Sequence, residues 1–153
     1  MSGFTRGVRL GIDVGSVRIG LAISDPDGIL ATPLRTLARP AKDSKVDVES
    51  DDISAIRRIV ADLGVVEVIV GLPVSLSGRE GPAAVLARHY AERVALSIDG
   101  VPVRLADERM STVVAARRLS ERGVRGKRQR QVVDQAAAVE ILQGWLDVQR
   151  RHT

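Results

Sequence analysis

Residues 8–22 read VRLGIDVGSVRIGLA, two apolar stretches rich in β-branched residues and separated by Gly15 and Ser16. Each stretch has the length of a strand and the glycine supplies a turn, so the segment predicts a β-hairpin. Asp13 closes the first strand. An ionised carboxylate in an apolar run is costly unless something pairs with it, and a divalent cation is one such partner. The alternative is an aspartate that bonds only the backbone of its own turn.

The chain beyond this hairpin alternates between strands and helices. A turn at residues 25–28, Asp-Pro-Asp-Gly, leads into a third strand, so the first three strands form an antiparallel meander. After Asp52, short apolar runs alternate with apolar residues at helical spacing, which favours parallel strands covered by helices on both faces. The expected strands are 7–13, 18–24, 32–37, 65–70 and 101–106, and the expected helices are 53–63, 83–98, 111–122 and 133–149.

Length and composition limit the class of protein. With 153 residues, of which 44% are hydrophobic, we expect a single α/β domain over residues 1–153, with a flexible loop at about 40–51. Aromatic residues are only 2%, which argues against single-strand binding by rows of stacked rings. The absence of cysteine excludes disulfides and thiolate zinc sites. No run approaches a membrane span and no signal peptide opens the chain, so we expect a cytoplasmic protein with no membrane partner.

Positive charge is concentrated in one segment. The chain as a whole has a net charge of +4, which suits a polyanionic partner without proving one. Residues 117–130 contain one acid, Glu121, and two glycines that predict a mobile loop in the second half. We expect this segment to contact phosphates, and the alternative is a merely solvated loop. Its seven cations are Arg117, Arg118, Arg122, Arg125, Lys127, Arg128 and Arg130.

Three acids fall where ligands bind in a sheet of this kind. Ligands bind at the carboxyl ends of parallel strands, where Asp13 ends the first strand and the pair at 107 and 108 follows the fifth. Asp134 comes after the basic segment, at the predicted start of the last helix, where free N–H groups alone would explain a carboxylate. Together these acids supply the hard oxygen ligands that suit Mg²⁺ or Mn²⁺. Such a cation could activate a water and stabilise a phosphodiester leaving group.

Asp107 and Glu108 should face opposite sides of the sheet, because neighbouring strand residues alternate. Asp107 is in phase with Val103 and Leu105, which leaves Glu108 on the other face. We therefore favour Glu108 as the metal ligand.

Four blocks of the chain together resemble one family. Residues 11–20, residues 70–73 with Gly78, residues 107–112 and residues 133–138 come in the order of the YqgF/RuvX family, also called pre-16S rRNA nuclease or Holliday junction resolvase-like. The resemblance implies an RNase H-like fold, with a mixed five-stranded sheet of meander and parallel strands flanked by helices. It also implies a metal-dependent endonuclease site. Carried over position by position, the catalytic and metal-binding acids would be Asp13, Glu108 and Asp134.

The activity that the resemblance implies is Mg²⁺- or Mn²⁺-dependent endonuclease cleavage of structured nucleic acid, in 5′-end maturation of pre-16S rRNA. Resolvases of the RuvC type are expected to carry a fourth acid three residues after the third, where this chain has Ala137. Arg109, beside Glu108, would neutralise phosphate charge or pair with a neighbouring acid. The residues expected to bind nucleic acid are Arg109, Arg117, Arg125, Lys127, Arg128 and Arg130.

Three alternatives stay open at this point. A Holliday junction resolvase would use the same residues on four-way DNA junctions, and its two symmetric cuts would require a homodimer, whereas rRNA maturation is compatible with a monomer or a homodimer. A non-catalytic nucleic-acid-binding module would keep the fold but has no need of three acids. An actin- or sugar-kinase-like ATPase shares an Asp-x-Gly hairpin but needs a second domain, for which 153 residues leave no room.

Overall fold

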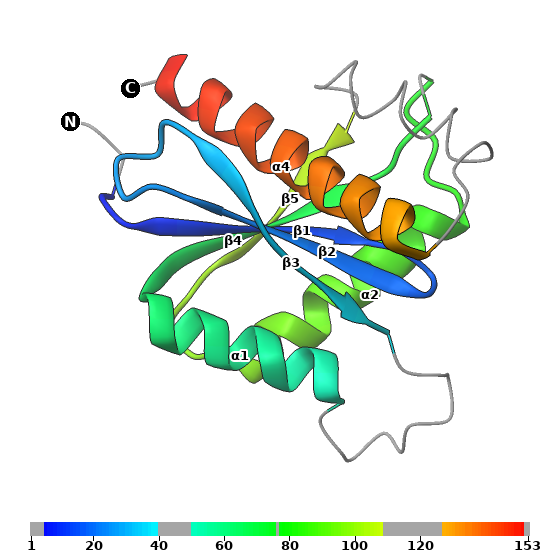
Figure 1. The fold of residues 1–153 in the computed structure, drawn as a ribbon. Helices are drawn as coiled ribbons and strands as arrows, with labels where there is room; N and C mark the ends of the chain where they lie inside the picture. The colour runs from blue at the N-terminus through cyan, green and yellow to red at the C-terminus, as the bar shows by residue number, and fades with distance from the viewer. Residues whose placement is uncertain (1–4, 40–49, 76, 109–126, 152–153) are drawn as a thin grey trace.

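The chain forms a five-stranded sheet with helices on both faces (Figure 1). The computed structural model describes residues 5–39, 50–75, 77–108 and 127–151, and within 127–134 it describes the backbone alone. The strands are β1 (Val8–Val14), β2 (Arg18–Ser24), β3 (Ala31–Ala38), β4 (Val65–Leu72) and β5 (Val103–Asp107). The helices are α1 (Asp51–Leu63), α2 (Pro82–Ser97) and α4 (Lys127–Arg151).

The strand order is β3-β2-β1-β4-β5. The β1–β2 and β2–β3 pairs are antiparallel, and the β1–β4 and β4–β5 pairs are parallel. The mixed sheet that the sequence predicted, a meander extended by parallel strands, is therefore confirmed. No helix in the described part of the chain is long and apolar enough to cross a membrane.

Local sequence signals explain most element boundaries. Gly64 adopts the left-handed conformation at φ +62° and ends α1, as predicted from its place after the last helical apolar residue. Pro82 occupies the first turn of α2, where its missing N–H costs nothing. The strands are buried along nearly their whole length in β1 and β4, as expected for parallel strands covered on both faces.

Some predicted boundaries were wrong. The last helix begins at Lys127 rather than at Val133, so the four residues 127–130 are helical and not part of a loop. The prediction relied on apolar periodicity, but residues 127–131 are polar helix formers that extend the helix without contributing to an apolar stripe. Asp51, placed in the loop at about 40–51, is the first residue of α1. The rest of that loop, at 40–49, and the expected helix at 111–122 lie outside the described residues.

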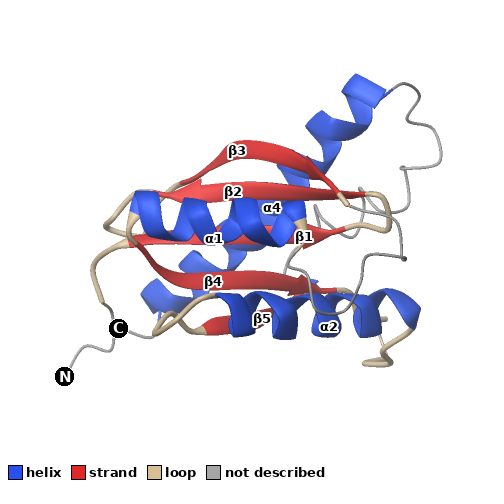
Figure 2. Cartoon of the chain, turned by 90° about the horizontal axis from the view of Figure 1, so that it is seen from below, coloured by secondary structure: helices blue, strands red, loops and turns tan. Residues whose placement is uncertain are grey.

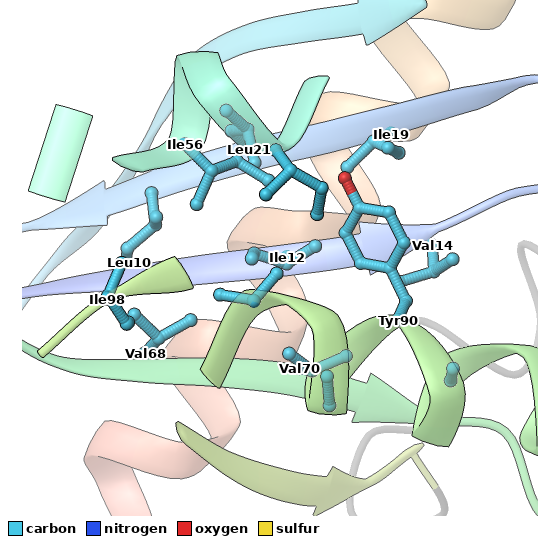
Figure 3. Packing of buried hydrophobic residues seen from close by; sticks show 14 of the residues in the cluster. Leu10, Ile12, Val14, Ile19, Leu21, Ile56, Val68, Val70, Tyr90 and Ile98 are labelled. Carbon is cyan, nitrogen blue, oxygen red and sulfur yellow. The ribbon is translucent and has the colours of Figure 1, made fainter. Parts of the chain in front are cut away.

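Two hydrophobic clusters fill the space between the layers. In Figure 1, α1 and α2 lie below the sheet and α4 lies above it. The larger cluster packs β1, β2 and β4 against α1 and α2, and it surrounds Tyr90, the largest fully buried side chain (Figure 3). The Tyr90 hydroxyl donates a 2.6 Å hydrogen bond to the buried carboxylate of Asp52. The smaller cluster packs Ile69 and Ala106 against α4, which contributes Ala138, Ile141, Leu142 and Leu146.

Gly11 of β1 lets α4 lie close against the sheet. A Cβ at this position would be 2.7 Å from Leu142 Cβ and 3.1 Å from the Ala138 carbonyl oxygen. Both of those atoms belong to or adjoin the helix backbone and cannot move aside without displacing α4. Any larger residue would therefore lift the helix from β1.

We expect Gly11→Ala to lower the free energy of unfolding by roughly 1–3 kcal/mol, because overpacking forces a shift of helix against sheet. Gly144→Ala is the matched control in α4, since a Cβ there would meet nothing within 4 Å. That change should be neutral or stabilise by about 0.4–1 kcal/mol, because it restricts the unfolded chain. Urea unfolding of both variants measures the difference. Equal stabilities would contradict the close approach of α4 to β1.

Candidate active site

Asp13 lies at the carboxyl end of β1, on the face of the sheet that α4 covers. Its neighbours Ile12 and Val14 belong to the cluster under α1 and α2, and strand alternation places Asp13 on the opposite face with Gly11. The side chain is nearly buried, at 5% exposure. An ionised carboxylate in this position needs favourable partners, because transfer of a charge from water to an apolar interior is strongly unfavourable.

Glycines flank Asp13 on both neighbouring strands. Gly20 of β2 is its antiparallel partner. On the other side the parallel register pairs Ile12 with Val70, so the next position along β4 is Gly71. Neither neighbour therefore adds a side chain beside Asp13 on the α4 face, and over Gly71 that place is taken by Ile141 and the Glu108 carboxylate.

Glu108 directly follows β5 and reaches the same face. Ala106 belongs to the cluster under α4, and Glu108 is two residues further along, in phase with it. A Cβ at Gly71 would be 2.9 Å from Glu108 Oε1 and 2.5 Å from Ile141 Cδ1 of α4. The Glu108 carboxylate therefore lies over the bare backbone of β4, beneath α4, and it is 7% exposed.

By strand alternation, Asp107 lies on the opposite face of the sheet, the face that α1 and α2 cover. Val103 and Leu105 pack against the cluster under α1 and α2, and Asp107 follows them by the same alternation. In the β4–β5 register it pairs with Leu72, which also belongs to that cluster. The structure thus has the alternation of Asp107 and Glu108 that we expected from the sequence.

Asp13 and Glu108 lie on the two sides of β4. β1 and β5 are the strands that flank β4, and the arrowheads of β1 and β4 end side by side in Figure 2. Adjacent strands are about 4.8 Å apart, which puts β1 and β5 roughly 10 Å apart. Because Glu108 Oε1 lies over Gly71, its carboxylate spans part of that separation. Two buried carboxylates therefore lie on the α4 face at the carboxyl ends of the parallel strands, one from each side of β4.

Asp134 lies in α4, and its backbone lies at about the same position along the strand direction as Asp13. The next residue, Gln135, donates a 3.0 Å hydrogen bond through its amide to Thr36 Oγ1 of β3. Thr36 pairs with Gly20, and Gly20 pairs with Asp13. As the eighth residue of a helix that begins at Lys127, Asp134 is beyond the first turn. Free N–H groups at a helix start therefore do not explain this acid, contrary to the alternative considered from the sequence.

The structure describes none of the side chains predicted to bind nucleic acid. Arg109, Arg117 and Arg125 lie outside the described residues. Lys127, Arg128 and Arg130 form part of the first turn of α4, where the backbone alone is described. Their role stays a prediction.

Sequence reasoning underestimated Gly71. It placed the end of the fourth strand at Val70 and treated the glycine as a break, whereas β4 continues through Gly71 to Leu72. The glycine's function is spatial: it leaves room for both Ile141 and the Glu108 carboxylate. A glycine inside a strand pattern is a known sign of close approach, so the signal was present in the sequence.

Oxygen ligands for a hard cation are available in this arrangement. No group of three His, Cys, Asp or Glu side chains forms a metal cluster among the side chains that the structure describes, and Asp134 is not one of these. Asp13 and Glu108 supply two carboxylates, the ligand type that Mg²⁺ and Mn²⁺ prefer.

Comparison with known proteins identifies close relatives. The model of the RuvX family, described as Holliday junction resolvase, matches residues 7–148. A Nocardia farcinica protein named "Putative pre-16S rRNA nuclease" is 60% identical over 142 residues, which cover 93% of this chain and 78% of that protein. A Rhodococcus opacus protein of the same name is 58% identical over 146 residues, which cover 95% of this chain and 80% of that protein.

The fold has a counterpart among solved structures. T. thermophilus RuvC in complex with a Holliday junction substrate superimposes with a TM-score of 0.61 at 14% sequence identity, covering 96% of this chain and 97% of that one. At this identity the likeness shows the fold alone. The RNase H-like fold implied by the sequence blocks is confirmed.

Metal binding should distinguish the two neighbouring acids. Glu108→Gln should lower the affinity for Mn²⁺ by about tenfold or more, since even the removal of a partner that only orients a ligand costs about 10–100-fold. Asp107→Asn should change it by less than about threefold, a difference of about 0.7 kcal/mol, because Asp107 is in phase with the other face. Calorimetric titration with Mn²⁺ measures both, and circular dichroism checks the fold. A larger effect in Asp107→Asn would show that the strand bends at its end and that Asp107 is the ligand.

Proposed function

The chain belongs to the RuvX family, and from this premise we propose that it is a divalent-metal-dependent endonuclease that hydrolyses phosphodiester bonds in pre-16S rRNA. The relatives at 60% and 58% identity carry the name of that activity, and they match more than nine-tenths of this chain. The observation that carries the proposal is the pair of buried carboxylates, Asp13 and Glu108, on the α4 face at the carboxyl ends of the parallel strands, with Glu108 over the bare backbone of Gly71.

The residues present fit a hard divalent cation. Asp13 and Glu108 are buried acids on one face, and the sheet between them carries no side chain at Gly71. In this proposal Asp13, Glu108 and Asp134 hold Mg²⁺ or Mn²⁺. When bound, the cation supplies a Lewis acid and lowers the pKa of a coordinated water. Ala137, at the position expected to carry a fourth acid in RuvC-type resolvases, is fully buried in this chain.

The protein's own groups orient the reaction. Three elements supply the acids: Asp13 comes from the end of β1, Glu108 from the end of β5 and Asp134 from α4. Asp13 lies within a paired strand and Glu108 directly follows one, so the sheet positions both acids and little reorganisation is needed when the scissile phosphate arrives. A water attacks the phosphorus and gives up a proton to the solvent, while the bond to the leaving oxygen breaks and that oxygen takes up a proton from the solvent.

A four-way DNA junction is the second candidate substrate. The description of the matched family, Holliday junction resolvase, favours it. Resolution requires two symmetric cuts, so this candidate requires a homodimer, whereas cleavage of an rRNA precursor does not. One preparation with defined Mg²⁺ or Mn²⁺ should be given a 16S precursor fragment and a synthetic junction. Faster cleavage of the precursor supports the proposal, and faster cleavage of the junction supports the alternative.

Asp13→Asn should preserve folding and polyanion binding while lowering cleavage by at least about a hundredfold. The change removes charge with little change in volume, and stabilisation of transition-state charge by a bound cation is worth several kcal/mol. Glu108→Gln and Asp134→Asn should show comparable reductions, and Asp107→Asn a smaller one. Single-turnover cleavage at saturating Mg²⁺ is the measurement. Undiminished cleavage by Asp13→Asn would reject Asp13 as a catalytic ligand.

The basic segment before Asp134 should deliver the nucleic acid. Replacing Arg125, Lys127, Arg128 and Arg130 with glutamine should weaken binding to all sequences alike, because side chains that bind phosphates position the strand without reading bases. The plot of log affinity against log salt should flatten by roughly 0.9 for each duplex phosphate that is no longer neutralised, or about 0.7 for a single strand. Cleavage at saturating substrate should fall less than affinity does. An unchanged slope in a titration at several salt concentrations would mean that these side chains are only solvated.

A further inference from the structure

A hydrogen-bonded turn follows β4, the strand that lies between β1 and β5. The chain between β4 and α2 leaves the sheet one residue after Leu72 and extends to the α4 side in Figure 1. Since β4 lies between β1 and β5, this turn begins between Asp13 and Glu108. Its position alone makes it part of the surroundings of the candidate active site.

Ser75 fixes the backbone of Arg79 in this turn. The Arg79 N–H donates to Ser75 Oγ at 3.0 Å, and the Ser75 N–H donates to the Arg79 carbonyl oxygen at 2.9 Å. The Gly78 N–H donates to the Ser75 carbonyl oxygen at 2.8 Å, and Gly78 adopts φ +88°, a conformation that favours glycine. The Cα from which the Arg79 side chain extends is therefore held in place.

The acid next to Arg79 is already engaged. Glu80 accepts hydrogen bonds of 2.5 and 2.6 Å from Nε and NH2 of Arg88, the two-bond arrangement that suits a guanidinium and a carboxylate. These bonds hold the pKa of Glu80 below its ordinary value. Within the described part of the chain, the exposed guanidinium of Arg79 makes no hydrogen bond or ion pair. Arg79 thus presents an uncompensated positive charge on the connection that leaves the sheet between the strands of the two acids.

We propose that Arg79 binds a phosphate of the substrate strand next to the bond that is cleaved, an inference that rests on the proposed nuclease function. A phosphodiester strand that approaches two carboxylates is repelled by them, and a fixed cation at the same edge offsets that repulsion. Arginine suits this task because its planar group donates two parallel hydrogen bonds to phosphate. The fixed turn also lowers the entropic cost of forming these bonds.

The test compares Arg79→Gln with a matched variant on the far side of the sheet. Arg58 is an exposed arginine on α1, which packs on the opposite face from the carboxylates, so Arg58→Gln removes the same charge away from the site. Binding of a 16S precursor fragment is titrated at several salt concentrations, with every variant also carrying Asp13→Asn to prevent cleavage. The cleavage parameters kcat and KM are measured separately, in variants that keep Asp13.

Arg79→Gln should flatten the salt dependence by roughly 0.9 log units of slope for a duplex phosphate, or about 0.7 for a single strand. It should raise KM while kcat stays within about threefold, because Arg79 binds the phosphate both before and during the reaction. Arg79→Lys should keep the slope, since it keeps the charge. Arg58→Gln should match the wild type in every measurement.

The outcomes separate this inference from the proposed function. If the wild type cleaves the fragment and Arg79→Gln has the wild-type slope and KM, the inference is overturned and the proposed function stands. If both glutamine variants flatten the slope equally, Arg79 acts only through net charge and the inference is again overturned. If the wild type does not cleave with Mg²⁺ or Mn²⁺, the proposed function fails and the inference fails with it.

Discussion

The close packing of α4 on the sheet is the constraint on which the rest of the site depends. At Gly11 the helix approaches until Leu142 Cβ would be 2.7 Å from an added Cβ, and at Gly71 the Ile141 methyl would be 2.5 Å away. These glycines lie on the adjacent strands β1 and β4. The same bare backbone at Gly71 gives the Glu108 carboxylate its place. The absence of a side chain at Gly71 thus sets both the packing of α4 and the position of the Glu108 carboxylate. A change in the packing of α4 would therefore also move Glu108.

Polar contacts hold α4 in register along its length. Gln135 bonds Thr36 near the site, and Gln143 accepts from the Ala31 N–H and donates to the Ile29 carbonyl oxygen at the β2–β3 turn. Towards its other end, the Trp145 indole donates to Glu67, which also pairs with Arg9 and Arg104. An apolar stripe alone would let a helix slide or rotate on its sheet, because apolar contacts are not directional. These directed bonds fix the level of the backbone at Asp134 relative to Asp13.

Local rules predicted the fold well, because strand alternation, turn residues and helix caps act over a few neighbours. The alternation of Val103, Leu105 and Asp107 was enough to assign Glu108 to the α4 face. The start of α4 was missed since no Ser, Thr, Asp or Asn directly precedes Lys127, and since residues 127–130 place cations at the amino end of a helix, which disfavours positive charge. The spatial role of Gly71 was missed as well. A glycine inside a strand pattern signals a close approach, but the residue that approaches, Ile141, is remote in sequence. Asp134 was grouped with Asp13 from its place beside the basic segment and from the family resemblance, and its side chain lies outside what the structure describes.

The carboxylates are hard to explain as part of a folding core. The α4 face elsewhere is built from residues such as Ile69 and Ala106, and apolar side chains at positions 13 and 108 would pack there without desolvating charge. Two acids that converge under a helix also repel each other, more strongly than in water because the surroundings are less polar. In the proposed function a bound cation would offset both penalties at once. Because it would bind only where the strands and α4 have assembled the ligands, metal binding and the stability of this part of the fold would be thermodynamically linked. In the proposed nuclease, the cation that the reaction requires would then also stabilise this arrangement of strands and helix.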